Sequence, residues 1–147
     1  ASSVGQERQT YRMHSETGEF VSNLTKGKLA FATDYCGVRS GRDVEKFLET
    51  GLTREPASQV GAPMIKESPV SIECRVREEK EYGSHCVFTA DVLAVHVDKE
   101  YMDEKGKFDL AMARPIVYSH GEYYGLGKKL GTFGYSINKR RKKQQKK

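Results

Sequence analysis

The sequence predicts a mainly-β protein with short helices, organised as an antiparallel barrel in one domain. Residues 70–77 alternate apolar and polar side chains, and residues 85–97 form a long run rich in β-branched side chains after the turn at Gly83 and Ser84. Two such runs around a short turn are typical of a hairpin. Helical patterns are short and lie before residue 52, while glycine-rich turns follow the hairpin. Long strands with brief helical excursions favour an antiparallel barrel over a helical or parallel fold.

The first fifty residues contain the predicted helices. Residues 6–18 predict a helix of one or two turns that ends at Gly18, and residues 19–23 predict a short strand. Residues 28–37 carry helix formers in their first half and end in a glycine. We expect a second helix there.

The clearest helix in the sequence spans residues 42–51. Asp43 is placed to cap its start, Phe47 and Leu48 contribute to one apolar stripe, and Gly51 ends it. A loop marked by three prolines then leads to the predicted hairpin.

The predicted hairpin has a defined buried face. The strict alternation of residues 70–77 places their apolar side chains inward and their polar side chains outward; the inward set is Val70, Ile72, Cys74 and Val76. After the hairpin, residues 103–107 predict a turn and residues 115–118 a further short strand.

Charge divides the chain into two parts. The formal net charge is +5, but residues 138–147 hold seven of the 25 basic side chains, and the rest carries 18 basic against 20 acidic. We therefore predict a domain over residues 1–137 and a basic, disordered tail over residues 138–147. A nucleic-acid-binding domain spreads positive charge over a face of its fold, so a nucleic-acid partner is not expected.

Several classes of site are not expected. No apolar run approaches the roughly 20 residues that span a bilayer, so we expect no membrane partner. Three cysteines, an odd number without paired spacing, favour a reducing cytoplasm. The four histidines share no metal-ligand spacing, and no nucleophile or paired-carboxylate pattern is present, so the sequence predicts no metal site and no catalytic side chain.

Six short motifs nevertheless occur in an order typical of one family. They are Arg8-x-Thr10-Tyr11, residues 17–23 (TGEFVSN), residues 34–47 (DYCGVRSGRDVEKF), Ala62-Pro63-x-Ile65, Gly83-x-His85 and residues 123–127 (YYGLG). Each motif is weak alone, but together and in this order they resemble the flavin reductase-like family of FMN-binding split barrels.

The resemblance implies a Greek-key split barrel that binds FMN and usually forms a homodimer. It also implies electron transfer from NADH or NADPH through FMN to a flavin, an iron complex or a partner protein. Members of the family begin with strands that precede the Arg-x-Thr motif. Arg8 comes so early here that the resemblance predicts an N-terminally incomplete barrel.

The resemblance also places the cofactor. FMN needs cations, hydroxyls and free backbone N–H groups for its phosphate. Arg8 and Thr10 lie at the family's phosphate-binding segment, with Ser2 and Ser3 before them. The complete expected set of FMN-binding residues is Ser2, Ser3, Arg8, Thr10, Ser40, Gly41, Arg42, Lys46, His85 and Tyr124.

Two alternatives stay open at this level. The chain could be a truncated, non-enzymatic barrel remnant that acts as a binding or dimerisation module, or a nucleic-acid-associated protein that acts through its basic tail. Bound flavin would favour the FMN-dependent function over both.

Overall fold

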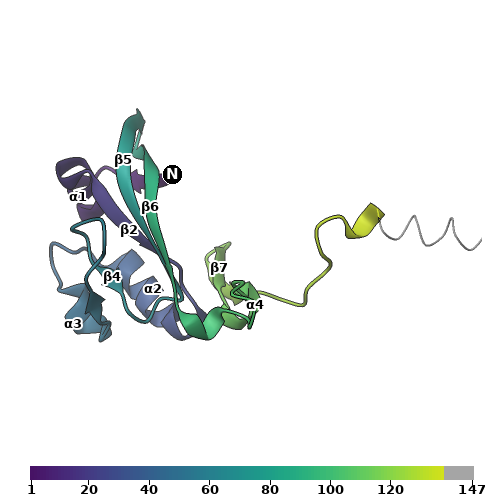
Figure 1. The fold of residues 1–147 in the computed structure, drawn as a ribbon. Helices are drawn as coiled ribbons and strands as arrows, with labels where there is room; N and C mark the ends of the chain where they lie inside the picture. Colours follow the sequence, from purple (N-terminus) through teal and green to yellow (C-terminus); the bar gives the residue numbers. More distant parts are fainter. Residues whose placement is uncertain (138–147) are drawn as a thin grey trace, which may run out of the picture.

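The main sheet has four antiparallel strands in the order β1-β6-β5-β2 (Figure 1). The computed structural model describes residues 1–137 of the chain. Two-stranded ribbons, β3–β4 and β7–β8, flank the main sheet. In chain order the elements are β1 (Ser2–Gly5), α1 (Gln9–Thr17), β2 (Glu19–Asn23), η1 (Gly27–Leu29), α2 (Ala30–Val38), α3 (Lys46–Thr50), β3 (Arg54–Glu55), β4 (Met64–Ile65), β5 (Val70–Tyr82), β6 (His85–Val97), η2 (Lys99–Tyr101), α4 (Leu110–Ala113), β7 (Ile116–Ser119) and β8 (Glu122–Gly125).

The β5–β6 hairpin forms the centre of the sheet, and its antiparallel pairing confirms the predicted hairpin. Tyr82 pairs with His85 across a turn in which Gly83 has a φ of 60°, a conformation that glycine adopts without steric cost. The register shifts twice along β5, between residues 73 and 74 and between residues 76 and 78. Such bulges bend and twist a strand, and here the sheet curls into a half-barrel.

The core lies where α1 covers one end of the curled sheet. Phe88 of β6 is completely buried. The ring of His14 in α1 stacks on Phe20 at 4.5 Å and meets Phe88 edge-on at 5.2 Å. Burying a phenylalanine of this kind contributes roughly 2–3 kcal/mol to folding. Gly18 ends α1 in the left-handed conformation with a φ of 66°, as predicted.

The predicted alternation of β5 is wrong at two polar positions. Ser71 and Glu73 are buried, although the sequence pattern places them outward. Residues 58–60 lie against the outer side of β5 and donate hydrogen bonds to the Glu73 carboxylate. A loop therefore covers the face that simple alternation would leave in water.

The helix predicted over residues 42–51 begins later than expected. The N–H groups of Asp43 and Val44 donate to the Ser40 carbonyl, which builds a turn where the first helical residues were predicted. The cap of α3 is consequently Glu45, whose carboxylate accepts from the Phe47 N–H at 3.2 Å. Gly51 ends this helix as predicted, and α2 continues through Gly37 to Val38 rather than ending at the glycine.

One strand precedes Arg8, which the sequence analysis did not assign. β1 pairs along β6 from Ser2 opposite Phe88 to Gly5 opposite His85. The predicted basic tail, residues 138–147, lies outside the described residues. Within residues 1–137, no helix is long and apolar enough to cross a membrane.

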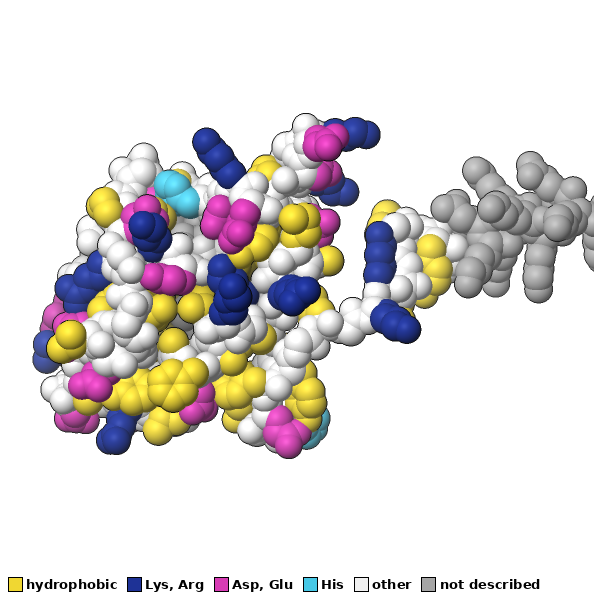
Figure 2. Space-filling model, turned by 90° about the horizontal axis from the view of Figure 1, so that it is seen from below, with side chains coloured by type: hydrophobic (Ala, Val, Ile, Leu, Met, Phe, Trp, Pro, Cys, Tyr) yellow, Lys and Arg dark blue, Asp and Glu magenta, His cyan; other side chains and the backbone are white. Residues whose placement is uncertain are grey.

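The C-terminal part of the domain consists of short elements and then leaves the body. The Asp109 carboxylate caps α4 by accepting from the Ala111 N–H at 2.8 Å, and β7 pairs with β8 from Ile116 opposite Gly125. Beyond β8 the chain extends away from the rest of the molecule (Figure 1). Hydrophobic side chains gather along one edge of the face seen from below, over α2 and the β7–β8 hairpin (Figure 2).

Candidate functional site

A cleft of about 380 Å³ lies between β1, the start of α1, the end of α2 and the loop that leads to α3. The cleft brings together seven of the ten residues predicted to bind FMN, and the remaining lining comes from neighbouring backbone and side chains. The predicted residues in the lining are Ser3, Arg8, Thr10, Ser40, Gly41, Lys46 and His85.

The cleft is cationic. Arg8, Arg39 and Lys46 line it, and no Asp or Glu is among its lining residues. The hydroxyls of Ser3, Thr10 and Ser40 add neutral donors. Sequence reasoning missed Arg39, although it lies directly before the Ser40-Gly41 pair that was singled out. Outside the lining, the Glu7 carboxylate pairs with Arg8 Nε at 3.6 Å. A cleft lined by cations and hydroxyls is suited to an anionic ligand.

Two of these cations also contact the C-terminal end of α2. Arg8 donates from Nη1 to the Gly37 carbonyl at 3.1 Å, and Lys46 donates from Nζ to the Cys36 carbonyl at 2.6 Å. The last carbonyls of a helix lack intrahelical donors and carry partial negative charge, so cations stabilise them. Arg8 and Lys46 therefore hold the walls of the cleft together as well as supplying charge.

The N-terminus of α1 opens into the same cleft. Arg8 is the N-cap, with an extended backbone, and its side chain makes no capping hydrogen bond. The first N–H groups of a helix have no intrahelical acceptor, and together with the helix dipole they favour an anion. Gln9 and Thr10, the first two residues of α1, both line the cleft.

Gln9 carries an unsatisfied acceptor. Its Oε1 is buried and has no hydrogen-bond partner among the described residues. A buried carbonyl oxygen without a donor costs free energy, so a ligand hydroxyl or N–H that reached it would gain from pairing. The sequence does not single out Gln9, because a glutamine beside a phosphate-binding motif is ordinary until its side-chain oxygen is known to be buried.

The other three predicted residues lie elsewhere. Arg42 donates from Nη2 to the Glu7 carbonyl at 3.1 Å and does not line the cleft. Tyr124 lies on β8, where its hydroxyl donates to the Glu122 carboxylate, and this contact raises the pKa of the tyrosine. Ser2, on β1, lines an adjoining hollow instead.

The adjoining hollow is largely apolar. Its volume is about 550 Å³, and its floor includes Ile72 and Val92 from the main sheet. Thr10 lines both the hollow and the cationic cleft. A larger cavity of about 910 Å³ lies between α4 and the β7–β8 hairpin, but none of the ten predicted residues lines it. The cationic cleft could therefore hold the anionic end of a ligand while the adjoining hollow holds its apolar part.

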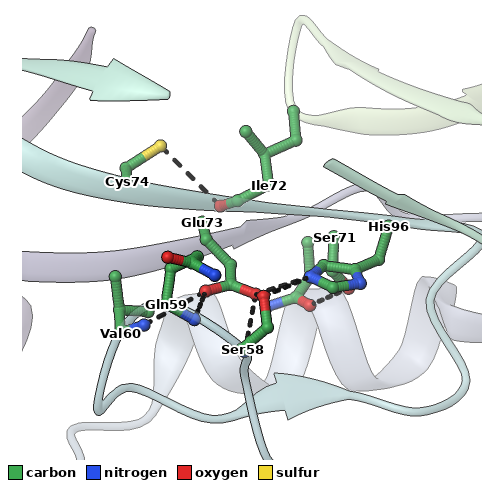
Figure 3. Close-up of polar contacts among 9 residues, drawn as sticks. Ser58, Gln59, Val60, Ser71, Ile72, Glu73, Cys74 and His96 are labelled. Carbon is green, nitrogen blue, oxygen red and sulfur yellow. Dashed lines mark hydrogen bonds and ion pairs between the residues drawn. The ribbon is translucent and has the colours of Figure 1, made fainter. Parts of the chain in front are cut away.

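A second polar cluster lies on the other side of β5 (Figure 3). The Glu73 carboxylate accepts from the N–H groups of Ser58, Gln59 and Val60 at 2.8, 2.6 and 3.1 Å, and contacts His96 Nε2 at 2.5 Å.

A serine, a histidine and a carboxylate meet in this cluster, but not in the order that nucleophilic catalysis needs. The Ser58 hydroxyl donates to Glu73 at 2.8 Å, and its 3.4 Å contact with His96 falls on the same Nε2 that contacts Glu73. A relay requires the carboxylate and the nucleophile on opposite ring nitrogens. This cluster anchors the loop and does not form a triad.

Comparison with known proteins agrees with the fold. The model of the flavin reductase like domain family matches residues 1–127. An uncharacterized protein of Pyrococcus abyssi is 32% identical over 107 residues, covering 73% of this chain and 60% of the relative. The chain thus spans about 60% of the length of the first curated relatives that it matches.

Solved structures share the same arrangement. Flavoredoxin of Desulfovibrio vulgaris (Miyazaki F) aligns with a TM-score of 0.83 at 28% identity, covering 92% of this chain and 73% of its own. Flavoredoxin from Methanosarcina acetivorans aligns with the same score and identity, over 92% of this chain and 74% of its own. An FMN-binding protein from Thermus thermophilus, at 20% identity and a TM-score of 0.74 over 88% of this chain and 70% of its own, shows the fold alone. The chain belongs to the flavin reductase-like family of FMN-binding split-barrel proteins.

Proposed function

We propose that this protein binds FMN, with the phosphate in the cationic cleft, and that it transfers electrons from NADH or NADPH through the flavin. The observation that carries the proposal is the composition of the cleft. Three cations, three hydroxyls and a helix N-terminus converge there without a carboxylate in the lining. Family membership supports a flavin cofactor, and the composition of the cleft supports this position for its phosphate.

The residues of the cleft divide the binding between them. Arg8, Arg39 and Lys46 neutralise the phosphate dianion, and the free N–H groups at the start of α1 donate to its oxygens. The unpaired Oε1 of Gln9 accepts from a hydroxyl of the ribityl chain. FMN, when bound, supplies the hydride and electron chemistry, while the protein supplies binding, orientation and electrostatics.

The electron donor and the assembly state are parts of the same proposal. Family membership supports NADH or NADPH as the donor and a homodimer as the working unit. The exposed aromatic side chains of the β7–β8 hairpin support the dimer, because large apolar groups left in water mark interaction surfaces. The cytoplasmic location predicted from the cysteines stays a prediction.

The competing function is a barrel module that does not bind FMN. Its support is that Arg8 and Lys46 already have acceptors at the end of α2, so their presence in the cleft walls does not require a ligand. Measuring FMN binding separates the two functions, because the module would show none.

A pair of titrations tests the proposal. FMN and riboflavin differ only in the phosphate, and binding of each quenches or shifts flavin fluorescence. We expect the chain to bind FMN more tightly than riboflavin by tenfold or more, in line with about 1.5–3 kcal/mol for a charged hydrogen bond. Absence of binding to either ligand would support the module instead.

A further inference from the structure

The twelve residues that follow β8 form an exposed apolar segment, which we call the C-terminal arm (residues 126–137). Leu130 is 91% exposed and Phe133 is fully exposed, while Leu126 and Ile137 are more than half exposed. Beyond Lys129, the backbone hydrogen bonds of the arm between described residues are local, from Tyr135 to Thr132 and from Ile137 to Gly134. The arm projects from the body rather than packing on it (Figure 1).

An exposed aromatic surface lies on the body at the root of the arm. We call it the aromatic patch and define it by Phe31 and Tyr35 of α2 and Tyr118 and Tyr123 of the β7–β8 hairpin. The Phe31 and Tyr35 rings stack at 6.1 Å, and the Tyr118 and Tyr123 rings lie 5.1 Å apart. The Tyr123 hydroxyl donates to Asp34 at 3.3 Å, which joins the hairpin to α2.

The aromatic patch is preorganised but uncovered. Phe31 is 74% exposed and Tyr118 is 64% exposed. Hydrophobic side chains gather over the same two elements in the view from below (Figure 2). Rigid aromatic side chains are the groups that most often anchor protein interfaces.

Charge identifies what covers these surfaces. Residues 1–127 carry 16 basic and 20 acidic side chains, whereas residues 128–147 carry nine basic and none acidic. Two of these nine, Lys128 and Lys129, lie in the arm, and the other seven follow it in residues 138–147. The C-terminal segment of residues 128–147 is therefore cationic, and the body that carries the patch is anionic. One copy's C-terminal segment attracts the body of another, and its apolar side chains match an apolar patch.

We infer that two copies of this chain exchange their C-terminal arms, each arm lying on the aromatic patch of the other copy. The exchange is reciprocal, because a self-complementary contact between identical chains closes with twofold symmetry. Arm side chains Leu130 and Phe133 bury on Phe31 and its neighbours. This inference rests on the homodimer of the proposed function and names the segments that build it.

Light scattering and sedimentation velocity of the full chain test the inference. The parent chain is a dimer at micromolar concentration. The Leu130→Asp/Phe133→Asp variant weakens dimerisation by at least ~30-fold, as expected when buried anchor residues are lost. The patch variant Phe31→Asp has the same effect. All variants remain folded and unfold cooperatively, which shows that the loss of the dimer is not a loss of the fold.

A matched control uses an apolar side chain that the inference does not involve. Met13 of α1 is 51% exposed, and α1 lies on the opposite side of the body from the arm (Figure 1). Met13→Asp leaves the dimer unchanged. Raising the salt concentration weakens the parent dimer, because the charges that attract arm to body are screened.

Three outcomes overturn the inference. If the dimer persists in both the arm and the patch variants, the two copies associate through another face. The arm exchange is then refuted, while the homodimer of the proposed function is retained. If the parent chain is monomeric but binds FMN, both the homodimer and the arm exchange are refuted, while the proposal of FMN binding stands. A monomeric chain that floats with anionic phospholipid vesicles through Leu130 and Phe133 assigns the arm to a membrane surface.

Discussion

Glu73 and His96 face each other across neighbouring strands, with 2.5 Å between a completely buried carboxylate oxygen and the ring Nε2. Burial raises the pKa of Glu73. The hydrogen bonds from Ser58, Gln59 and His96 lower it by more than burial raises it, so the pKa falls from 4.5 to about 2. The ionised carboxylate is thus a structural element that ties a loop to the sheet.

The depressed pKa gives a pH dependence of definite sign. Because the pKa of Glu73 is about 2 in the folded chain and near 4.5 when unfolded, its stabilisation is present above pH 4.5 and is lost as the pH falls toward 2. Thermal unfolding across this range should show the parent losing stability more steeply than Glu73→Gln. Parallel curves for the two proteins would show that Glu73 does not titrate as described.

At neutral pH, Glu73→Gln should lower the melting temperature by on the order of 10 °C. The substitution keeps the volume of the side chain but replaces one acceptor oxygen with a donor that faces the N–H groups of residues 58–60. Gln59→Ala is the matched control, since only the Gln59 backbone binds Glu73. We expect that control to unfold within a few degrees of the parent.

Arg8→Ala should weaken FMN binding roughly ten- to hundredfold and riboflavin binding much less, because riboflavin lacks the phosphate. Thr10→Ala removes one neutral donor and should cost about 1 kcal/mol. Arg12, exposed on α1 and paired with Glu16 at 3.3 Å, is the control, and Arg12→Ala should leave both affinities unchanged. Equal losses for the two flavins in Arg8→Ala would place the phosphate elsewhere.

Arg39 and Lys46 should separate binding from stability. The Arg39 side chain makes no hydrogen bond or ion pair with another described residue, whereas Lys46 binds the Cys36 carbonyl. Arg39→Ala should therefore weaken FMN binding without changing the melting temperature, and Lys46→Ala should lower both. Differential scanning fluorimetry and FMN titration of the same samples measure the two effects; an Arg39→Ala protein with full FMN affinity would remove Arg39 from the site.

Gln9→Met should weaken FMN and riboflavin equally. Methionine fills the space of glutamine but cannot accept the ribityl hydrogen bond that we assign to Oε1. Removing a buried, unpaired oxygen should at the same time leave the flavin-free chain as stable as the parent or slightly more so. A loss confined to FMN would mean that Gln9 acts through the phosphate.

Local patterns predicted much of this fold, and tertiary contacts explain where they failed. The hairpin and the glycine that ends α1 follow from alternation and turn chemistry, which are local. The late start of α3 depends on the turn at Ser40, and the burial of Glu73 depends on a loop from a distant part of the sequence. Neither contact is visible in the periodicity of the segment that it changes.

The candidate site was predictable to a similar extent. Family motifs identified the residues around the start of α1 and before α3, which the fold brings into one cleft. Arg39 and Gln9 were missed because the features that distinguish them exist only in the fold. Among the described residues, the Arg39 side chain has no partner, and the buried Oε1 of Gln9 accepts no hydrogen bond. Tyr124 and Arg42, also predicted to bind the cofactor, lie outside this cleft and contact Glu122 and the Glu7 carbonyl, so their roles stay predictions.

The most direct test of this account is the binding of FMN and riboflavin to the unmodified chain, followed by flavin fluorescence under identical conditions. The account predicts saturable binding of both, with FMN bound at least tenfold more tightly because the cationic cleft takes the phosphate. Equal affinity for the two flavins, or no binding of FMN, would contradict it.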